Sequence, residues 1–416
     1  MAAIVPHAVR SGNPRPSRPG GAGLAEPLDT RPVHPIACAA MSSPTIAARR
    51  PSPRRLAEAG LLLVVFVLGL LLSVAGGSVE RPKFETLPDG TRQRARTTSA
   101  TGEEVPATER VNKFLNAQNL AQLAKDTSFF AIMAVGMTFV IVAGQIDLSI
   151  GSIYALCSVL TAMLLRHYGP EGSAAGAGVG GTWLAVGTCM AVGMGCGLAN
   201  GVMVTGLGVH PFIITLGTMA IYRGIAFVAT QGQSIGSFPE LLRRVVGWQA
   251  WGGLTLTPLL ITIVVTAVAG VFLSRTVPGR HVYAVGGNEL ASRFSGIRTG
   301  RVKVLVFMAS GLAASLAAMV QLGYYGAASS NDGQGYELHV IASAVVGGAS
   351  LSGGRGSALG AALGALVIQM ITSGIVIVGI DQNYSQIIIG LVVVAAVLLD
   401  QANQWWRRRQ LVAQAR

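Results

Sequence analysis

Charged residues are scarce in this sequence of 416 residues, of which only 12% are Asp, Glu, Lys or Arg. Soluble globular domains contain about 25% charged residues, so the composition excludes that broad class. Hydrophobic residues make up 51% of the chain, and its mean hydropathy is +0.54. The 54 glycines suit helices that pack closely in lipid. The composition therefore predicts an all-α polytopic membrane protein.

Acidic residues are the rarer charge, with 18 Asp and Glu against 31 Lys and Arg, which gives a formal net charge of +13. Such an excess of positive charge is common among nucleic-acid-binding proteins. Here the basic residues lie mostly in the tails and in short segments between apolar runs. That placement is typical of the residues that orient a membrane protein, so we expect a lipid bilayer and no nucleic acid as partner.

Metal-binding and catalytic patterns are few. Three of the four cysteines, Cys157, Cys189 and Cys196, lie in apolar segments, and no His or acid stands beside the latter pair to complete a metal site. The six histidines are scattered, and neither H-E-x-x-H nor the phosphate-binding pattern G-x-x-x-x-G-K-[ST] occurs. We therefore expect no enzyme active site, no metal site and no cofactor bound by this chain.

The two ends of the chain are basic. Residues 1–55 hold ten of the 18 prolines and eight arginines without a long apolar run, which predicts a disordered tail. A short basic segment from Met41 leads directly into the first apolar run, so Met41 is an alternative start. Residues 56–405 are expected to form the transmembrane domain. Residues 406–416 are expected to form a basic C-terminal tail.

Ten apolar segments can cross a hydrocarbon core, which requires about 20 residues with their flanks. They lie near 61–77, 127–144, 148–165, 183–207, 211–229, 255–274, 303–323, 338–350, 357–379 and 384–400. An even number places both termini on one side, and the basic residues next to the first and last spans predict that this side is cytoplasmic. The polar segment 78–126 is then an external loop, whose end at 114–125 looks like an amphipathic lead-in to the next span. The basic segment 275–303 is cytoplasmic.

The sequence GQIDLSIG at 144–151 places Asp147 at the junction of two spans. A charge buried at the centre of a bilayer costs about 2.5–3.5 kcal/mol on insertion scales. In one interpretation a broken helix lets Gln145, Asp147 and Ser149 line a solvated path. In the other, Asp147 caps the following helix at a cytoplasmic turn that water reaches. The residues leave both interpretations open.

Two further segments carry unusual polar residues. Asn200 lies late in one span, and Arg223 lies well along the next, where it either faces a pore or extends to the external interface. Glu337 begins the segment 335–356, which ends in a glycine cluster and predicts a second broken element. Glu337 is either a functional carboxylate or an acid at the positive end of a helix.

Six stretches in order between Phe114 and Asp400 resemble one family. They are FLNAQNLAQL, GMTFVIVAGQIDLSIGS, ANGVMVTGLGVHPFIITLGTMAIYRG, GRHVYAVGGNELASRFSGI, GYELHVIASAVVGGASLSGGRGS and the closing span. Together they resemble the permease subunits of bacterial ATP-binding-cassette importers for monosaccharides, which are related more distantly to branched-chain amino-acid permeases. The tail before Met41, the segment 78–109 and Gln145, where family members often have Gly or Glu, depart from this pattern.

The resemblance implies a multi-pass permease in the bacterial inner membrane that moves a simple sugar, such as the pentoses ribose or xylose. Its expected partners are cytoplasmic ATPase subunits, an extracytoplasmic sugar-binding protein and a second copy of the permease. ATP and magnesium would bind only in the partner ATPase. Nucleosides and branched-chain amino acids fit less well as solutes.

The resemblance also assigns roles to residues. It implies that a short cytoplasmic helix docks in a groove of the partner ATPase, and the residues of this coupling element are Gly286, Gly287, Asn288, Glu289, Ala291, Phe294 and Gly296. Their chemistry agrees, because the glycines can form a turn and Asn288 can cap a helix. The expected substrate path is formed by Gln145, Asp147, Ser149, Asn200, Thr215 and Glu337.

A different class of transporter fits some of the same residues. An ion-coupled secondary transporter would use Asp147 or Glu337 as its ion site. In that case the segment 275–303 would be an ordinary solvated loop between two spans.

Overall fold

The computed structural model describes residues 53–86, 92–98, 104–170, 172–173, 178–248 and 255–414. The disordered tail predicted over 1–55 and the alternative start at Met41 fall almost wholly outside these ranges. All described residues belong to one compact unit, 51–416.

The described residues form thirteen α-helices and one short 3₁₀ helix, which confirms the all-α class. The helices are α1 Pro53–Gly76, α2 Ala117–Val142, α3 Ile150–His167, α4 Gly178–Leu207, α5 Pro211–Thr230, α6 Glu240–Val246, α7 Thr257–Arg275, α8 Val277–Gly287, α9 Glu289–Phe294, α10 Thr299–Tyr325, α11 Tyr336–Val346, α12 Ala358–Val378 and α13 Ser385–Gln414. The 3₁₀ helix is Gln382–Tyr384.

Each of the ten expected spans coincides with a helix, but they differ in length. Among the described residues, eight helices are long and apolar enough to cross a membrane, and shorter apolar helices lie at 336–346 and 382–398. The span expected at 338–350 is therefore wrong in length, because α11 has 11 residues and extends about 16 Å. The glycine cluster that follows breaks the helix. The boundary expected at 405 falls inside α13.

The segment 78–126 is not a simple loop. Six short strands form three antiparallel pairs: β1 Ser78–Pro82 with β6 Thr108–Asn112, β2 Phe84–Thr86 with β3 Arg92–Arg94, and β4 Arg96–Thr98 with β5 Glu104–Pro106. The pairs meet at three residues whose backbone hydrogen bonds form a ring, since Lys83 donates to Ala107, Ala107 to Ala95 and Ala95 to Lys83 at 2.8 Å each. Helix α2 begins at Ala117, within the stretch 114–125 that was expected to lead into the next span.

Helix α2 forms the centre of the helical bundle. Its side chains from Thr127 to Val142 are buried without exception, as expected for a helix that is apolar on all sides. Helix α10 packs against α4 through glycines, since a Cβ at Gly193, Gly197 or Gly201 would collide with the backbone of α10. Small residues at this spacing let two helix backbones approach closely in lipid.

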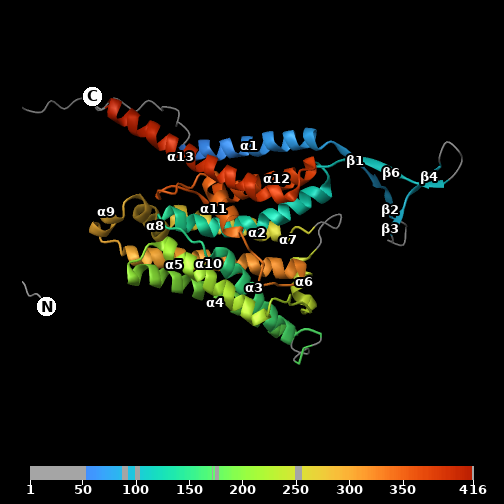
Figure 1. Cartoon of the computed structure of the whole chain (residues 1–416), viewed down its shortest axis with the longest axis horizontal. Coiled ribbons are helices and arrows are strands. Elements are labelled where there is room, and N and C mark those ends of the chain that lie inside the picture. Colours follow the sequence, from blue (N-terminus) through green and yellow to red (C-terminus); the bar gives the residue numbers. More distant parts are fainter. Residues whose placement is uncertain are drawn as a thin grey trace, which may run out of the picture. The chain divides into compact units, whose positions relative to one another are not determined.

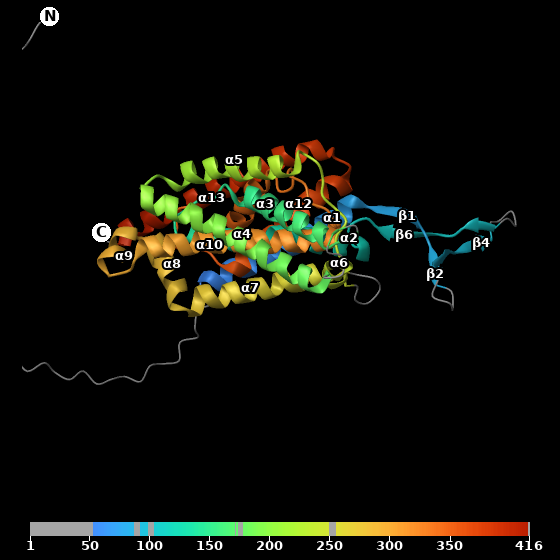
Figure 2. The same ribbon diagram turned by 90° about the horizontal axis from the view of Figure 1, so that it is seen from below.

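The long helices run roughly parallel to one another, as Figures 1 and 2 show. Helices α8 and α9 lie at one end of the bundle, and the strand pairs lie at the other. The start of α1 and the end of α13 lie at the α8–α9 end in Figure 1. An even number of membrane spans places both ends of the transmembrane domain on the same side, as observed.

Candidate functional site

The chain is irregular between α2 and α3, and this segment carries Asp147. Helix α2 ends at Val142, Gly144 adopts a positive φ of 73°, and α3 begins at Ile150. The Asp147 side chain is fully buried. Its Oδ1 accepts hydrogen bonds from the Ser149 backbone N–H at 3.0 Å and from the Ser149 hydroxyl at 2.6 Å. Its Oδ2 accepts one from the Ser310 hydroxyl at 2.8 Å.

Helices α4 and α5 add two more members to this group. The Asn200 amide donates to Ser149 Oγ at 2.8 Å, and the Tyr222 hydroxyl donates to Asn200 Oδ1 at 3.2 Å. We call Asp147, Ser149, Asn200, Tyr222 and Ser310 the buried polar network. It ties the start of α3 to α4, α5 and α10. The hydrogen bonds satisfy groups that would be costly to leave unpaired in an apolar bundle.

The burial of Asp147 decides one point left open by the sequence. Water does not reach this turn in this conformation, because the side chain has no exposed surface, although Asp147 does accept a backbone N–H just before α3, as a cap would. The N-cap position of α3 is occupied by Ser149, which makes no side-chain capping bond. In this conformation the network is closed to solvent, so a solute path through it requires the helices to separate.

The other residues expected in the substrate path, Thr215, Gln145 and Glu337, are not members of the buried polar network. Thr215 is buried on α5, with its hydroxyl 3.0 Å from the Pro211 carbonyl oxygen. The Gln145 amide donates to the Gly144 carbonyl at 3.0 Å. Glu337 lies in the first turn of α11 next to Gly151, which agrees with the helix-start interpretation. Among the described residues, no hydrogen bond joins Glu337 to the network.

The arginine at position 223 connects α5 to the segment before α11. Its Nη1 donates to the Ser330 carbonyl at 2.7 Å and to the Asp332 carbonyl. The guanidinium is half-buried. Arg223 thus holds α5 to the segment before α11.

The expected coupling element is a short helix at the tip of a turn. Asn288 caps α9, because its Oδ1 accepts a hydrogen bond from the Ala291 backbone N–H at 2.9 Å. The chain leaves α9 through Gly296, whose φ is 81°. Phe294 is 84% exposed, and Leu290, one helical turn earlier, is 65% exposed. Two large apolar side chains on one exposed face indicate a surface that a partner covers.

Leu290 was missed in the sequence, where the coupling residues of this helix were expected to be Glu289, Ala291 and Phe294. Gly286 and Gly287 do not form the turn expected of them, since they end α8 and the turn lies at Asn288. Gly286 is instead a packing residue. A Cβ at this position would overlap the Val142 carbonyl oxygen at the end of α2.

Glu289 has an ion-pair partner within the chain. Its carboxylate forms an ion pair with the Lys303 ammonium group at 2.7 Å, which fixes α9 to the first turns of α10. Lys303 therefore has a structural role besides its contribution to the orientation of the protein in the membrane.

The sequence also contains one G-x-S-x-G match, at Gly232–Gly236. A nucleophile elbow needs a strand before the serine and a helix after it. Here α5 precedes the match and an irregular segment follows it. The local structure therefore excludes an elbow.

Residues 119–397 match the model of the family described as branched-chain amino acid transport system, permease component. The chain belongs to this family. The matched range contains the whole buried polar network and the α8–α9 turn, and the strand pairs precede it. These two features are therefore parts of the permease fold itself.

Several curated relatives of this permease are similar over most of their length. The ribose import permease of Escherichia coli (strain K12) is 37% identical over 294 residues, which cover 70% of this chain and 88% of the relative. The ribose import permease of Bacillus subtilis (strain 168) is 36% identical over 293 residues, covering 69% and 86%. The D-allose transport system permease of Escherichia coli (strain K12) is 34% identical over 288 residues, covering 69% and 85%. No solved structure matches the permease.

Proposed function

We propose that this permease moves a simple sugar, a pentose such as ribose or xylose, as the membrane subunit of an ATP-binding-cassette importer of the bacterial inner membrane. The observation that carries the proposal is the similarity, over most of the chain, to permeases named for the import of ribose and of allose. Ribose is a pentose and allose a hexose, so the common chemistry is a small polyhydroxylated ring.

ATP hydrolysis takes place in separate cytoplasmic ATPase subunits, which bind ATP and magnesium. The apolar tip of α9 supports this part of the proposal, because Leu290 and Phe294 are exposed where a partner would cover them. Basic residues flank this turn, since Arg275 ends α7, Arg293 lies in α9 and Arg298 immediately precedes α10, which favours placement of this end in the cytoplasm. Both termini then lie in the cytoplasm and the strand pairs lie outside.

A second copy of the permease and an extracytoplasmic sugar-binding protein complete the importer. The binding protein releases the sugar at the strand end of the bundle. Movement of α9 by the ATPases then separates the helices around Asp147 and gives the sugar access to Gln145, Asn200, Thr215 and Glu337.

Uptake by reconstituted vesicles tests this function. Proteoliposomes that contain the permease with its co-encoded ATPase and binding protein are expected to accumulate labelled ribose or xylose only when ATP is supplied inside. Ionophores that abolish proton and sodium gradients are expected to leave the rate unchanged. Uptake that survives ATP depletion and stops with the ion gradient would instead identify an ion-coupled transporter.

The importer proposal gives Asp147 a structural role, and two substitutions test it. Asp147→Ala removes the acceptor of the Ser149 and Ser310 hydroxyls, at a cost of about 1–3 kcal/mol for each buried group left unpaired. We expect a clearly lower midpoint of thermal denaturation in detergent. Asp147→Asn keeps one acceptor oxygen, so we expect a midpoint near that of the natural chain and substantial ATP-driven uptake. A stable Asp147→Asn variant without uptake would favour an ion carried by this carboxylate.

A further inference from the structure

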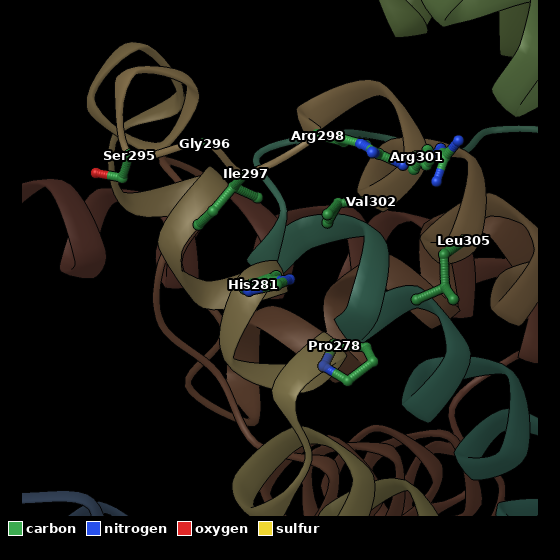
Figure 3. Close-up of a pocket in the computed structure, with 9 residues that line it drawn as sticks. All are labelled: Pro278, His281, Ser295, Gly296, Ile297, Arg298, Arg301, Val302 and Leu305. Atoms are coloured by element: carbon green, nitrogen blue, oxygen red, sulfur yellow. The ribbon is translucent and has the colours of Figure 1, made fainter.

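A pocket beside the α9 turn is lined by one residue of the expected coupling element, Gly296, while its other lining residues have no role in the transport cycle described above. It lies between α8, the segment 295–298 and the first turns of α10, and it has a volume of about 430 Å³. Arg298 and Arg301 lie along one edge in Figure 3, with Pro278 at the opposite edge and His281 between. The remaining wall is largely apolar and includes Ile297, Val302 and Leu305.

The charged residues that line this pocket are all basic. No residue in its lining is acidic. Within the described ranges, neither the Arg298 nor the Arg301 guanidinium forms an ion pair or a hydrogen bond. The nearest acid in the sequence, Glu289, is already paired with Lys303. Two unpaired guanidinium groups beside an apolar wall favour a ligand that carries both a phosphate and a hydrocarbon part.

The depth of the pocket suits a lipid headgroup. Helix α10 has 27 residues and extends about 40 Å, whereas a hydrocarbon core is about 30 Å thick. Its first turns, which carry Arg301 and Leu305, therefore stand at the level of the headgroups. Val277 on α8 and Leu305 on α10 are 53% and 36% exposed, so apolar surface continues from the pocket toward the lipid.

We propose that this pocket binds the headgroup of an anionic phospholipid from the inner leaflet. The lipid phosphate lies against Arg298 and Arg301, and the glycerol and upper acyl chains lie against Ile297 and Leu305. A bound lipid then braces the segment that follows α9 against α8. The proposal does not depend on the solute, because lipid binding is measured without transport.

Native mass spectrometry of the full-length chain tests the proposal. The protein is released from nanodiscs of phosphatidylcholine with or without phosphatidylglycerol, and the retained lipids are counted. We expect one phosphatidylglycerol per protomer in the natural chain. The double variant Arg298→Gln and Arg301→Gln is expected to lose it, with binding weakened about tenfold or more from the removal of two charges near the membrane surface. Arg243→Gln with Arg244→Gln removes the same charge from α6 at the other end and is expected to retain the lipid.

A second variant keeps both arginines and fills the pocket. Leu305→Trp is expected to displace the lipid as well, because the site needs its apolar wall and its volume. This variant keeps the test decisive if the double arginine variant does not fold. Retention of the lipid by a folded Leu305→Trp protein would overturn the proposed position.

Three other results would also overturn the proposal. Equal retention of phosphatidylcholine would mean that the charge of the pocket is unused. Binding of glycerol 3-phosphate in detergent as tight as that of phosphatidylglycerol would identify a small soluble phosphate as the ligand. Unchanged lipid retention with weakened ATPase binding in the double arginine variant would assign the pocket to the ATPase interface.

Discussion

Replacing Leu290 and Phe294 together with serine is expected to abolish ATP-driven uptake. The two side chains form the exposed apolar face of α9, at 65% and 84% exposure. Burying a large apolar side chain at an interface contributes about 1.5–3 kcal/mol, so the loss of two such contacts weakens association with the ATPase about 100-fold or more. The measurements are the dissociation constant of the permease–ATPase complex and the initial rate of sugar uptake.

The strand pairs offer a matched control for this double variant. Phe84 and Val105 are also exposed apolar side chains, at 55% and 37%, but they lie at the opposite end of the bundle. Their replacement by serine is expected to leave the dissociation constant unchanged. Normal ATPase binding by the Leu290 and Phe294 variant would mean that α9 is not the docking helix.

The helical spans could be predicted because their signal is local. A run of about 20 apolar residues has few alternatives to a membrane helix, and every expected span coincides with a helix. The length of α11 was wrong, because the apolar run continues through Ala349 while the glycines end the helix at Val346. The strands between Ser78 and Asn112 gave no such signal, because short polar strands with prolines resemble a loop.

The candidate site was only partly predictable because its contacts are distant in sequence. Asp147 is conspicuous as a charge between two spans, but its partner Ser310 is 163 residues away. Serine is common in membrane helices, so nothing marks this one. Tyr222 was missed because its partner, Asn200, lies on another helix, and only the fold brings the two together. Glu289 and Lys303 were both visible, yet only the fold brings them together as an ion pair.

Gly286 connects the α8–α9 turn to the buried polar network. Its Cα lies against the Val142 carbonyl oxygen, which also accepts a hydrogen bond from the Gly354 backbone N–H at 2.8 Å. Val142 is the last residue of α2, and Asp147 follows it by five residues. A displacement of α8 would therefore act directly on the backbone that leads to Asp147.

The substitution Gly286→Ala is expected to reduce uptake about tenfold or more while the permease still binds its ATPase. The added Cβ would overlap the Val142 carbonyl, and because both groups belong to backbone, α8 must move away from the end of α2. Gly287→Ala is the matched control, since a Cβ there meets nothing within 4 Å, and we expect normal uptake. The measurements are ATP hydrolysis and sugar uptake in the same vesicles. Hydrolysis without uptake in Gly286→Ala alone would support transmission through this contact, whereas normal uptake would require another route from α9 to Asp147.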